Sequence, residues 1–374
     1  MRVGIDATLA AQARIVGISR FVVNLVEQLA AREELDRYDL FYRPRALRQP
    51  RRFWQPRDPR FRSHLLCFPL TLASFRGLDV YHGTYQWLPR YCGGARIVGM
   101  LHDIVYMSRP DLGSQRTRER AQARYRDVAA RSHLIATLSA YSKAEIVRLL
   151  GVEPARVRIV PLAAEPHYQP QSDERVAAAR HRHALEQPYV LFGGGFARRK
   201  NATGALRSFA RALPRLPPDV RLAISGAGGP LAGEAAQILR QPALAGRVQV
   251  LGYVSEDDYP SLMSGSLLFF LPTLLEGFGL PVLEAMACGA PVLSSSTTSV
   301  PEVCGDAAVL VDPEDETALA DALVDLCRDG DRRRSLRQLG LERARQFSWQ
   351  RVAETMLDIY QQAGSRGRPR QARS

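Results

Sequence analysis

The segment that decides the fold of this chain reads PTLLEGFGLPVLEAMACGAPVL, from Pro272 to Leu293. An apolar run ends just before it, and a loop with two glycines follows that run. Pro281 stands where the first turn of a helix would begin, and Gly289 with Pro291 would end that helix before the next strand. The segment therefore predicts a strand, a tight loop and a short helix, the repeating unit of a parallel sheet.

The same segment predicts a site for a phosphate flanked by two acids. Gly277 and Gly279 allow close backbone approach to a ligand, and the amino end of the helix favours an anion. Glu276 and Glu284 lie on either side of this anion site. Because a carboxylate repels a phosphate, we expect both glutamates to accept hydrogen bonds from sugar hydroxyls. Two glutamates at this spacing also occur by chance in helices, but the glycines and bounding strands favour a nucleotide-sugar site.

Apolar runs alternate with helical patterns in both halves of the chain, which predicts βαβ units. Strands are expected at 3–6, 65–68, 80–82, 97–102, 134–137, 157–160, 189–192, 221–225, 248–251, 267–271, 292–295 and 308–311, with helices at 19–31 and 139–150. The predicted class is α/β, with two Rossmann-like domains that face each other across a cleft.

A length of 374 residues favours two domains. We expect them at 1–170 and 185–349, with the polar segment 165–187 as a linker between the two series of strands. A helix at about 350–362, capped by Ser348, is expected to pack on the first domain. The arginine-rich tail 364–374 is predicted to be disordered.

Composition favours a globular protein of the cytosol. Apolar residues make up 46% of the chain, no apolar run is long enough to span a bilayer, and the first residues do not resemble a signal peptide. The five cysteines are scattered and form no C-x-x-C pair, which predicts reduced thiols rather than disulfides or a zinc site.

Nearly all of the net charge of +13 comes from residues 1–165. One contribution is the stretch Arg43 to Arg62, which also holds three aromatic residues, and another is Arg116, Arg120 and Arg124 at a spacing of four. This asymmetry predicts a surface that attracts polyanions, either anionic lipid headgroups or nucleic acid. A solvated face rich in arginine is the alternative.

The pattern Glu-x7-Glu from Glu276 to Glu284, with GFGLP inside it and AMACGAPV after it, resembles the signature of the retaining family 4 glycosyltransferases of the GT-B fold. The resemblance covers nearly the whole chain. Other similar segments follow in the family's order: 17–20 (GISR), 102–103 (HD), 199–201 (RKN), 252–254 (GYV) and 347–349 (FSW). The family implies that the second domain holds a nucleotide-sugar donor and that the first domain binds the acceptor.

The resemblance implies a role for each matching residue. Glu284 would bind the ribose hydroxyls, Glu276 the transferred sugar, Arg199 and Lys200 the pyrophosphate, and His102 the donor sugar. Further donor-binding residues would be Gly277, Phe278, Gly279, Leu280, Gly195, Val254 and Arg198, and the acceptor side would include Gly17, Ile18, Arg20 and Asp103.

Each role has a structural alternative. Arg199 and Lys200 could form a solvated surface pair, His102 could cap a strand end, and 17–20 could be only a turn and a helix start. The chain also departs from the family at 193–197. It reads GGGFA where many relatives have an arginine directly after a glycine, so Arg198 is expected to contribute to the phosphate site.

No metal or cofactor is expected. The string Asp329-Gly-Asp331 matches the letters of a metal-binding Asp-x-Asp, but it follows a helix and no strand precedes it, so we reject it. The charge of the departing diphosphate would then be met by the helix terminus, Arg199 and Lys200. The resemblance implies retention by front-side displacement, in which the leaving phosphate deprotonates the acceptor, so no protein base is named.

The strings 82–89 (HGTYQWLP), 101–104 (LHDI) and 199–201 look most like bacterial mannosyltransferases and rhamnosyltransferases of surface-polysaccharide assembly, including lipopolysaccharide. GDP-mannose is the expected donor, and a UDP-hexose or a rhamnosyl donor is the alternative. A glycan or polyprenyl-diphosphate-linked acceptor would suit the basic first domain and a peripheral position on the inner face of the cytoplasmic membrane.

Two other classes of protein remain as remote alternatives. A sugar-nucleotide 2-epimerase shares the two-domain architecture but has no use for a basic acceptor domain. A nucleic-acid-binding protein could use the same arginines, yet the sequence contains no helix-turn-helix, zinc finger or ribonucleoprotein motif. We therefore expect no nucleic-acid partner.

Overall fold

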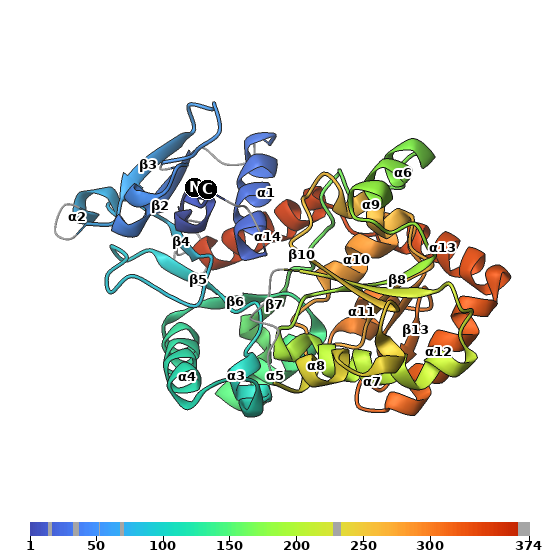
Figure 1. Ribbon diagram of the computed structural model, residues 1–374. Helices are drawn as coiled ribbons and strands as arrows, with labels where there is room; N and C mark the ends of the chain where they lie inside the picture. Colours follow the sequence, from blue (N-terminus) through green and yellow to red (C-terminus); the bar gives the residue numbers. More distant parts are fainter. Residues whose placement is uncertain (14–16, 33–36, 52, 68–70, 227–232, 366–374) are drawn as a thin grey trace. The chain divides into compact units, whose positions relative to one another are not determined.

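The computed structural model describes residues 1–13, 17–32, 37–51, 53–67, 71–226 and 233–365 (Figure 1). The chain forms two compact units. Unit 1 comprises Met1–Leu162 together with Ser348–Ser374, and unit 2 comprises Ala163–Phe347. The tail predicted to be disordered lies outside the described residues, apart from its first two positions, which belong to the last helix.

Unit 1 is built on a seven-stranded parallel sheet with the order β3-β2-β1-β4-β5-β6-β7. Its strands are β1 (Arg2–Asp6), β2 (Arg37–Tyr42), β3 (Phe61–Leu65), β4 (Val80–Gly83), β5 (Arg96–Met100), β6 (Leu134–Thr137) and β7 (Val157–Ile159). Its helices are α1 (Ile18–Ala30), α2 (Thr71–Ser74), α3 (Val105–Ser108), α4 (Gln115–Arg131), α5 (Ala140–Leu150) and α14 (Trp349–Ser365). The central strands are buried throughout, which explains why they read as continuous apolar runs.

The sequence-based prediction is wrong at one edge of this sheet, where β2 was missed and β3 was placed at 65–68. Asp39 interrupts the apolar pattern of β2, yet its side chain is fully buried. It accepts hydrogen bonds from Arg2 and lies 2.5 Å from His64 Nε2. Burial would raise the pKa of Asp39, but these partners lower it to about 2. The charged residue in β2 is thus neutralised by partners distant in sequence.

Helix α14 packs on α1, β4 and β5 of unit 1, as the sequence predicted for a helix at 350–362. The Ser348 hydroxyl accepts a hydrogen bond from the backbone amide of Arg351. The Tyr360 hydroxyl lies 2.8 Å from His82 Nδ1, and Glu354 pairs with Arg32 at 2.5 Å. These contacts fasten the end of the chain to the first unit.

Unit 2 contains a six-stranded parallel sheet with the order β10-β9-β8-β11-β12-β13. Its strands are β8 (Tyr189–Gly193), β9 (Arg221–Ser225), β10 (Val248–Gly252), β11 (Leu268–Leu271), β12 (Val292–Ser295) and β13 (Val309–Val311). Its helices are α6 (Asp173–Arg182), α7 (Ala202–Ala212), α8 (Gly233–Leu239), α9 (Tyr259–Ser264), α10 (Leu280–Ala287), α11 (Val300–Cys304), α12 (Glu316–Arg328) and α13 (Gly330–Ala344). Both units are therefore Rossmann-like, and the predicted fold class is confirmed.

The segment 165–187, predicted as a linker, contains helix α6. The Ser172 hydroxyl accepts a hydrogen bond from the amide of Arg175 and caps this helix. Helix α6 packs on α9, and beyond its end His183 lies 3.1 Å from Asp258. The helix is mostly exposed and polar, so its sequence lacks the apolar stripe that would have revealed it.

The five cysteines are all free thiols, and four of them are buried. In the part of the chain that the structure describes, no helix combines the length and apolar character needed to cross a bilayer.

Candidate active site

The candidate site of unit 2 lies where the sheet changes its direction of winding. Strands β8 and β11 are neighbours, while the chain leads from β8 to β9 on one side and from β11 to β12 on the other. The loops that follow β8 and β11 therefore diverge and leave a crevice at the carboxyl ends of the strands. The loop after β8 carries Arg199 and Lys200, and the loop after β11 carries Glu276. Residues far apart in sequence are thus brought together at this crevice.

Lys200 and Glu276 form a buried ion pair at this point. Lys200 Nζ lies 2.5 Å from Glu276 Oε1, and each side chain is only 7% exposed. Arg199 Nη1 donates to the other carboxylate oxygen at 3.0 Å. The Thr273 hydroxyl lies 3.0 Å from Glu276 Oε1 and 2.9 Å from the carbonyl oxygen of Arg199. One carboxylate therefore holds both basic residues of the predicted phosphate site.

The electrostatics of this pair depend on burial and on each partner. Burial would raise the pKa of Glu276, but the charges of Lys200 and Arg199 outweigh it and lower the pKa below its ordinary value. Burial also lowers the pKa of Lys200, and the attraction of Glu276 opposes that shift. The lowered pKa of Glu276 favours an ionised carboxylate, and the charge of that carboxylate opposes loss of the proton from the buried Lys200.

Close backbone packing explains two glycines of the loops. Gly194 has φ +143, and a Cβ there would come within 2.8 Å of the Lys200 side chain. Gly279 has φ +102 and immediately precedes α10. A side chain at either position would be strained, and at Gly194 it would also displace the lysine. The two glycines therefore shape the loops from which the ion pair projects.

The amino end of α10 is held in place by hydrogen bonds from the loop after β12. The Ser299 hydroxyl donates to the carbonyl oxygen of Glu276 at 2.9 Å, and the Glu276 amide donates to Thr298 Oγ1 at 3.4 Å. Among the described residues, no side-chain hydrogen bond caps this helix. Phe278 is buried against Phe347, with ring centroids 5.8 Å apart, so its backbone rather than its ring is available to a ligand. The arrangement leaves an uncapped helix terminus beside the ion pair, as phosphate binding requires.

Glu284 lies in the same electrostatic environment as the ion pair. It is 5% exposed and lies on α10, which packs on α9. Burial raises the pKa of Tyr259 on α9, and the charge of Glu284 raises it further. Glu284 also acts on Lys200, where it favours the charged amine. The structure therefore brings the two predicted acids and the predicted lysine together.

The remaining donor-side residues are distributed around this crevice. Gly195 donates its amide to the carbonyl oxygen of Ser225 at 2.8 Å, and Val254 is buried after β10. Arg198 begins the short 3-10 helix η5 (Arg198–Lys200) and is exposed. Gly277 and Leu280 lead into the start of α10. All of these residues follow the carboxyl ends of the strands in unit 2.

In unit 1, His102 follows β5 and is almost fully buried. Its Nε2 lies 3.0 Å from the carbonyl oxygen of Thr84, and its ring contacts Phe21 edge to face at 5.6 Å. Burial lowers the pKa of His102 to about 4, although the Thr84 carbonyl opposes the shift. The imidazole is therefore neutral at physiological pH. Its ring lies in the region where β1 and β4 form the corresponding crevice of the first sheet.

The predicted acceptor-side residues begin helices after β1 and β5. Gly17 has φ +53 and accepts the first hydrogen bond of α1 from the amide of Arg20, whose side chain is buried. Ile18 is the first residue of α1. Asp103 Oδ1 accepts a hydrogen bond from the amide of Val105. Residues 14–16, which lead into Gly17, lie outside the described residues.

The first crevice also holds residues that were not predicted as site residues, although three of them, Arg43, Thr84 and Trp87, lie in stretches already marked in the sequence. The Thr84 hydroxyl donates to the carbonyl oxygen of Asp6 at 2.6 Å, and Arg43 Nη2 lies 3.5 Å from Asp6 Oδ2. The Arg43 guanidinium also stacks over the Trp87 ring at 4.6 Å from its centroid. Trp87 belongs to a string that the resemblance had marked, whereas a lone buried aspartate at a strand end gives no distinct signal.

The basic stretch 43–62 is only partly a free surface. Arg60 donates to the carbonyl oxygens of Ala30 and Arg32 and pairs with Asp58 at 2.6 Å. Arg43 is likewise bound to Asp6. These arginines stabilise unit 1 internally, which composition alone could not distinguish from an exposed patch. By contrast, the arginines of α4 at 116, 120 and 124 are exposed, as their spacing predicted.

The rejected Asp-x-Asp string has a structural role. Asp329 caps α13 by accepting a hydrogen bond from the amide of Arg332 at 2.8 Å, and Asp331 pairs with Arg334. Among the residues that the structure describes, no group of three or more histidines, cysteines or acids is placed to hold a metal ion.

Comparison with known proteins agrees with this geometry. Residues 173–343 match the model of glycosyl transferases group 1, and residues 15–168 match that of glycosyltransferase family 4. An O-antigen chain mannosyltransferase B from Escherichia coli is 30% identical over 371 residues, which covers 92% of this chain and 96% of that protein.

Two solved structures share the fold. The sucrose-phosphate synthase of Thermosynechococcus elongatus has a TM-score of 0.75 at 20% identity and covers 98% of this chain and 100% of its own. The Anabaena protein HepE, solved with UDP and glucose, has a TM-score of 0.74 at 16% identity and covers 96% of this chain and 99% of its own.

The fold and site define an enzyme that transfers sugars. The chain belongs to the GT-B glycosyltransferases, with a family 4 domain followed by a group 1 domain.

Proposed function

We propose that the enzyme transfers mannose from GDP-mannose, with retention of configuration, to a glycan or polyprenyl-diphosphate-linked glycan in bacterial surface-polysaccharide synthesis. The observation that carries the proposal is the cluster of Arg199, Lys200 and Glu276 beside the uncapped start of α10. The similarity to an O-antigen mannosyltransferase along nearly the whole chain supports mannose as the sugar.

Lys200 and Arg199 are suited to meet the negative charge of the departing diphosphate. Both are already held by Glu276, so little reorganisation is needed when charge develops on the leaving group. The amides at the start of α10 add donors on the same side. This set of groups supports departure of the diphosphate without a metal ion.

In the proposed reaction, the bond from the sugar C1 to the β-phosphate oxygen breaks as the acceptor oxygen bonds to C1 on the same face. The acceptor proton passes to the departing phosphate. Glu284 binds the ribose hydroxyls and Glu276 binds the sugar being transferred. Neutral His102 is a hydrogen-bonding partner for the sugar rather than a charged acid.

The donor is tested by calorimetry on the full chain with GDP-mannose, UDP-glucose, ADP-glucose and a dTDP-rhamnose donor. We expect GDP-mannose to bind most tightly. If a UDP-hexose or a rhamnosyl donor binds most tightly instead, the transferred sugar is the one that this donor carries and not mannose.

Analysis of the products separates transfer from epimerisation. With GDP-mannose and a mannose oligosaccharide, we expect a longer oligosaccharide with the α configuration retained. Conversion of the donor to its 2-epimer in the absence of an acceptor would instead show an epimerase.

The exposed arginines of α4 support a peripheral position on an anionic membrane. Co-sedimentation with vesicles that contain phosphatidylglycerol should exceed that with neutral phosphatidylcholine vesicles and should fall when Arg116, Arg120 and Arg124 are all replaced by glutamine. Equal binding to both vesicles contradicts this part of the proposal. Salt-dependent binding to duplex DNA without binding of any nucleotide sugar would favour the nucleic-acid alternative.

A further inference from the structure

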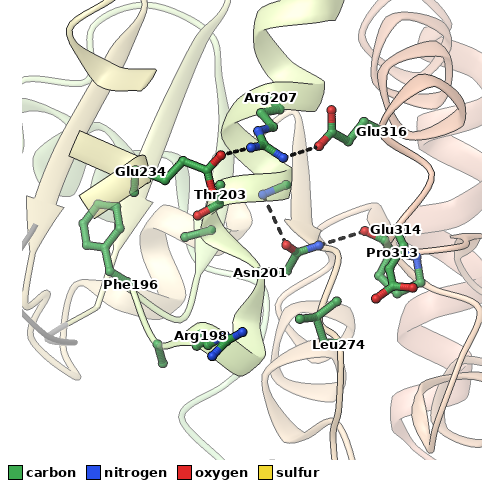
Figure 2. Close-up of a pocket in the computed structure, with 14 residues that line it drawn as sticks. Phe196, Arg198, Asn201, Thr203, Arg207, Glu234, Leu274, Pro313, Glu314 and Glu316 are labelled. Atoms are coloured by element: carbon green, nitrogen blue, oxygen red, sulfur yellow. Dashed lines mark hydrogen bonds and ion pairs between the residues drawn. The ribbon is translucent and has the colours of Figure 1, made fainter. Parts of the chain in front are cut away.

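Unit 2 contains a second pocket, of about 490 Å³, at the amino ends of α7, α8 and α12 (Figure 2). Helix α7 packs on α8 and α12, whereas α10 packs on α9, α11 and α13. The pocket is therefore associated with a different group of helices from the proposed donor site. Arg198 and Leu274 line its near side, on the loops that also carry Arg199 and Glu276. Its volume is in the range of pockets that hold small ligands.

An arginine between two acids forms one wall of this pocket. Arg207 on α7 pairs with Glu316 on α12 at 3.1 Å and with Glu234 on α8. Figure 2 shows the Arg207 guanidinium between these two carboxylates. Glu316 also accepts a hydrogen bond from Arg211 at 3.3 Å. Each carboxylate oxygen has about two acceptor positions, so acceptor capacity remains on both glutamates after the arginines are bound. The contacts hold the three side chains in place for a ligand with hydroxyl groups.

The opposite part of the pocket is also positioned by hydrogen bonds. Asn201 caps α7 by accepting from the amide of Gly204, and its Nδ2 donates to the carbonyl oxygen of Pro313 at 2.8 Å. Thr203 lies in the next turn and lines the pocket with a hydroxyl that can donate and accept. The ring of Phe196 and the side chain of Leu274 provide apolar surface.

The charges of the lining exclude some ligands and favour others. Three glutamates, Glu234, Glu314 and Glu316, face two arginines, Arg198 and Arg207. Arg211 also pairs with Glu316, at 3.3 Å, so three carboxylates are matched by three guanidinium groups. Balanced charge of this kind favours a neutral ligand over a phosphate or a nucleotide. A neutral ligand with many hydroxyls would use the carboxylates, the threonine and the guanidinium groups together, while its C–H face would lie on the phenylalanine ring.

We propose that this pocket binds a neutral saccharide, one or two hexose units of a glycan, separately from the donor sugar. The site goes beyond the proposed transfer reaction, since it takes no part in bond breaking. The enzyme would bind a glycan at this site through residues of unit 2 alone. The saccharide proposed to bind here carries no phosphate, whereas the donor carries a diphosphate.

The test measures hydrogen exchange of the full chain during titration with mannobiose and mannotetraose. A saccharide in this pocket should slow exchange in peptides that cover 201–207 and 313–317, which contain none of the residues proposed to bind the donor. Glu234→Gln and Thr203→Val should each weaken this protection, the first by about tenfold because it weakens a charge-assisted hydrogen bond. Thr203→Val keeps the shape of the side chain and so separates binding from local structure.

Asp321→Asn is the matched control, because Asp321 also pairs with an exposed arginine, Arg215, at 2.7 Å but does not line the pocket. It should leave the protection unchanged. The proposal is overturned if neither oligosaccharide protects these peptides, if the control weakens protection as much as Glu234→Gln, or if inorganic phosphate displaces the oligosaccharide. GDP-mannose titrated in parallel should bind all variants with equal affinity. If it fails to bind the wild type, that result contradicts the proposed function but not the saccharide pocket.

Discussion

Lys200 on the loop after β8 and Glu276 on the loop after β11 form an ion pair of 2.5 Å in which both side chains are nearly buried. The pair joins the two loops at the crevice of the second sheet. Burial lowers the pKa of Lys200, and the charge of Glu276 opposes this shift toward the neutral amine. A diphosphate that enters the crevice can therefore interact with a cation whose position is already set.

Removing one member of this pair should destabilise the protein. Glu276→Gln leaves the buried Lys200 without a charged partner, and we expect a loss of about 3 kcal/mol in the free energy of unfolding. Urea denaturation measures the change. The double variant Lys200→Met with Glu276→Gln should recover part of the loss, because no buried charge is left unpaired. A double variant as unstable as the sum of the single variants would argue against a coupled pair.

The pair should also contribute to acid sensitivity. Because the folded-state pKa of Glu276 is lowered, its stabilisation is present above its ordinary pKa of 4.5 and is lost as the pH falls through the lower folded value. The difference in unfolding free energy between wild type and Glu276→Gln should therefore shrink as the pH falls below about 4.5. Denaturation curves at a series of pH values measure it, and a difference that stays constant would refute the assigned direction.

Arg199 should matter for turnover more than for stability. Its side chain is 44% exposed, so Arg199→Gln should change the free energy of unfolding by less than about 1 kcal/mol. Loss of one cation at the leaving diphosphate should lower kcat by about a hundredfold. Arg215→Gln is the matched control, because Arg215 is also exposed and paired with an acid but lies away from the crevice. Equal kcat values for the two variants would contradict a role for Arg199 at the leaving diphosphate.

Substitutions of Glu276 and Glu284 should differ in their effects on the affinities for GDP and GDP-mannose. Glu284→Ala should lower the affinity for GDP and for GDP-mannose to the same extent, by about tenfold, because both ligands contain the ribose. Glu276→Gln should weaken the binding of GDP-mannose more than that of GDP, because we propose that Glu276 binds the sugar, which GDP lacks. Calorimetry on both variants gives the comparison. Equal effects of the two substitutions on both ligands would contradict the division of roles.

His102 should make a measurable contribution to the pH dependence of folding. Its folded-state pKa of about 4 is below the ordinary value of 6.5, so the unfolded chain takes up its proton first as the pH falls. The free energy of unfolding should therefore decrease between pH 6.5 and 4, by about 3 kcal/mol from this group. In His102→Gln the decrease should be smaller by that amount. An unchanged slope would mean that the imidazole is not buried and neutral.

Local sequence patterns identified the central strands and the loop that precedes α10. Strands such as β8 and β11 are covered on both faces, so their apolar runs are continuous and easily recognised. Strand β2, which is next to the edge strand β3, and exposed helix α6 gave weaker patterns. In β2 the buried Asp39 is balanced by Arg2 and His64, which come from other strands, and no local pattern reports such a balance.

The site was predicted as residues but not as a set of contacts. The glycines and acids from Glu276 to Glu284 predicted a phosphate-binding helix with sugar-binding neighbours, and a resemblance supplied Arg199 and Lys200. That Glu276 holds both basic residues, with Thr273 beside it, appears only when two loops meet across the sheet. The pocket around Arg207 likewise depends on three helices that no single segment specifies.

The sequence by itself determined the α/β class, the position of helix α10 and the identity of the acids around its start. It could do so because backbone preferences and apolar periodicity act over a few neighbouring residues. Only the tertiary structure decided which charges pair, which arginines stay exposed and where a second pocket opens. Those outcomes depend on burial and on distances between residues remote in sequence, and the energies of charged groups change with both.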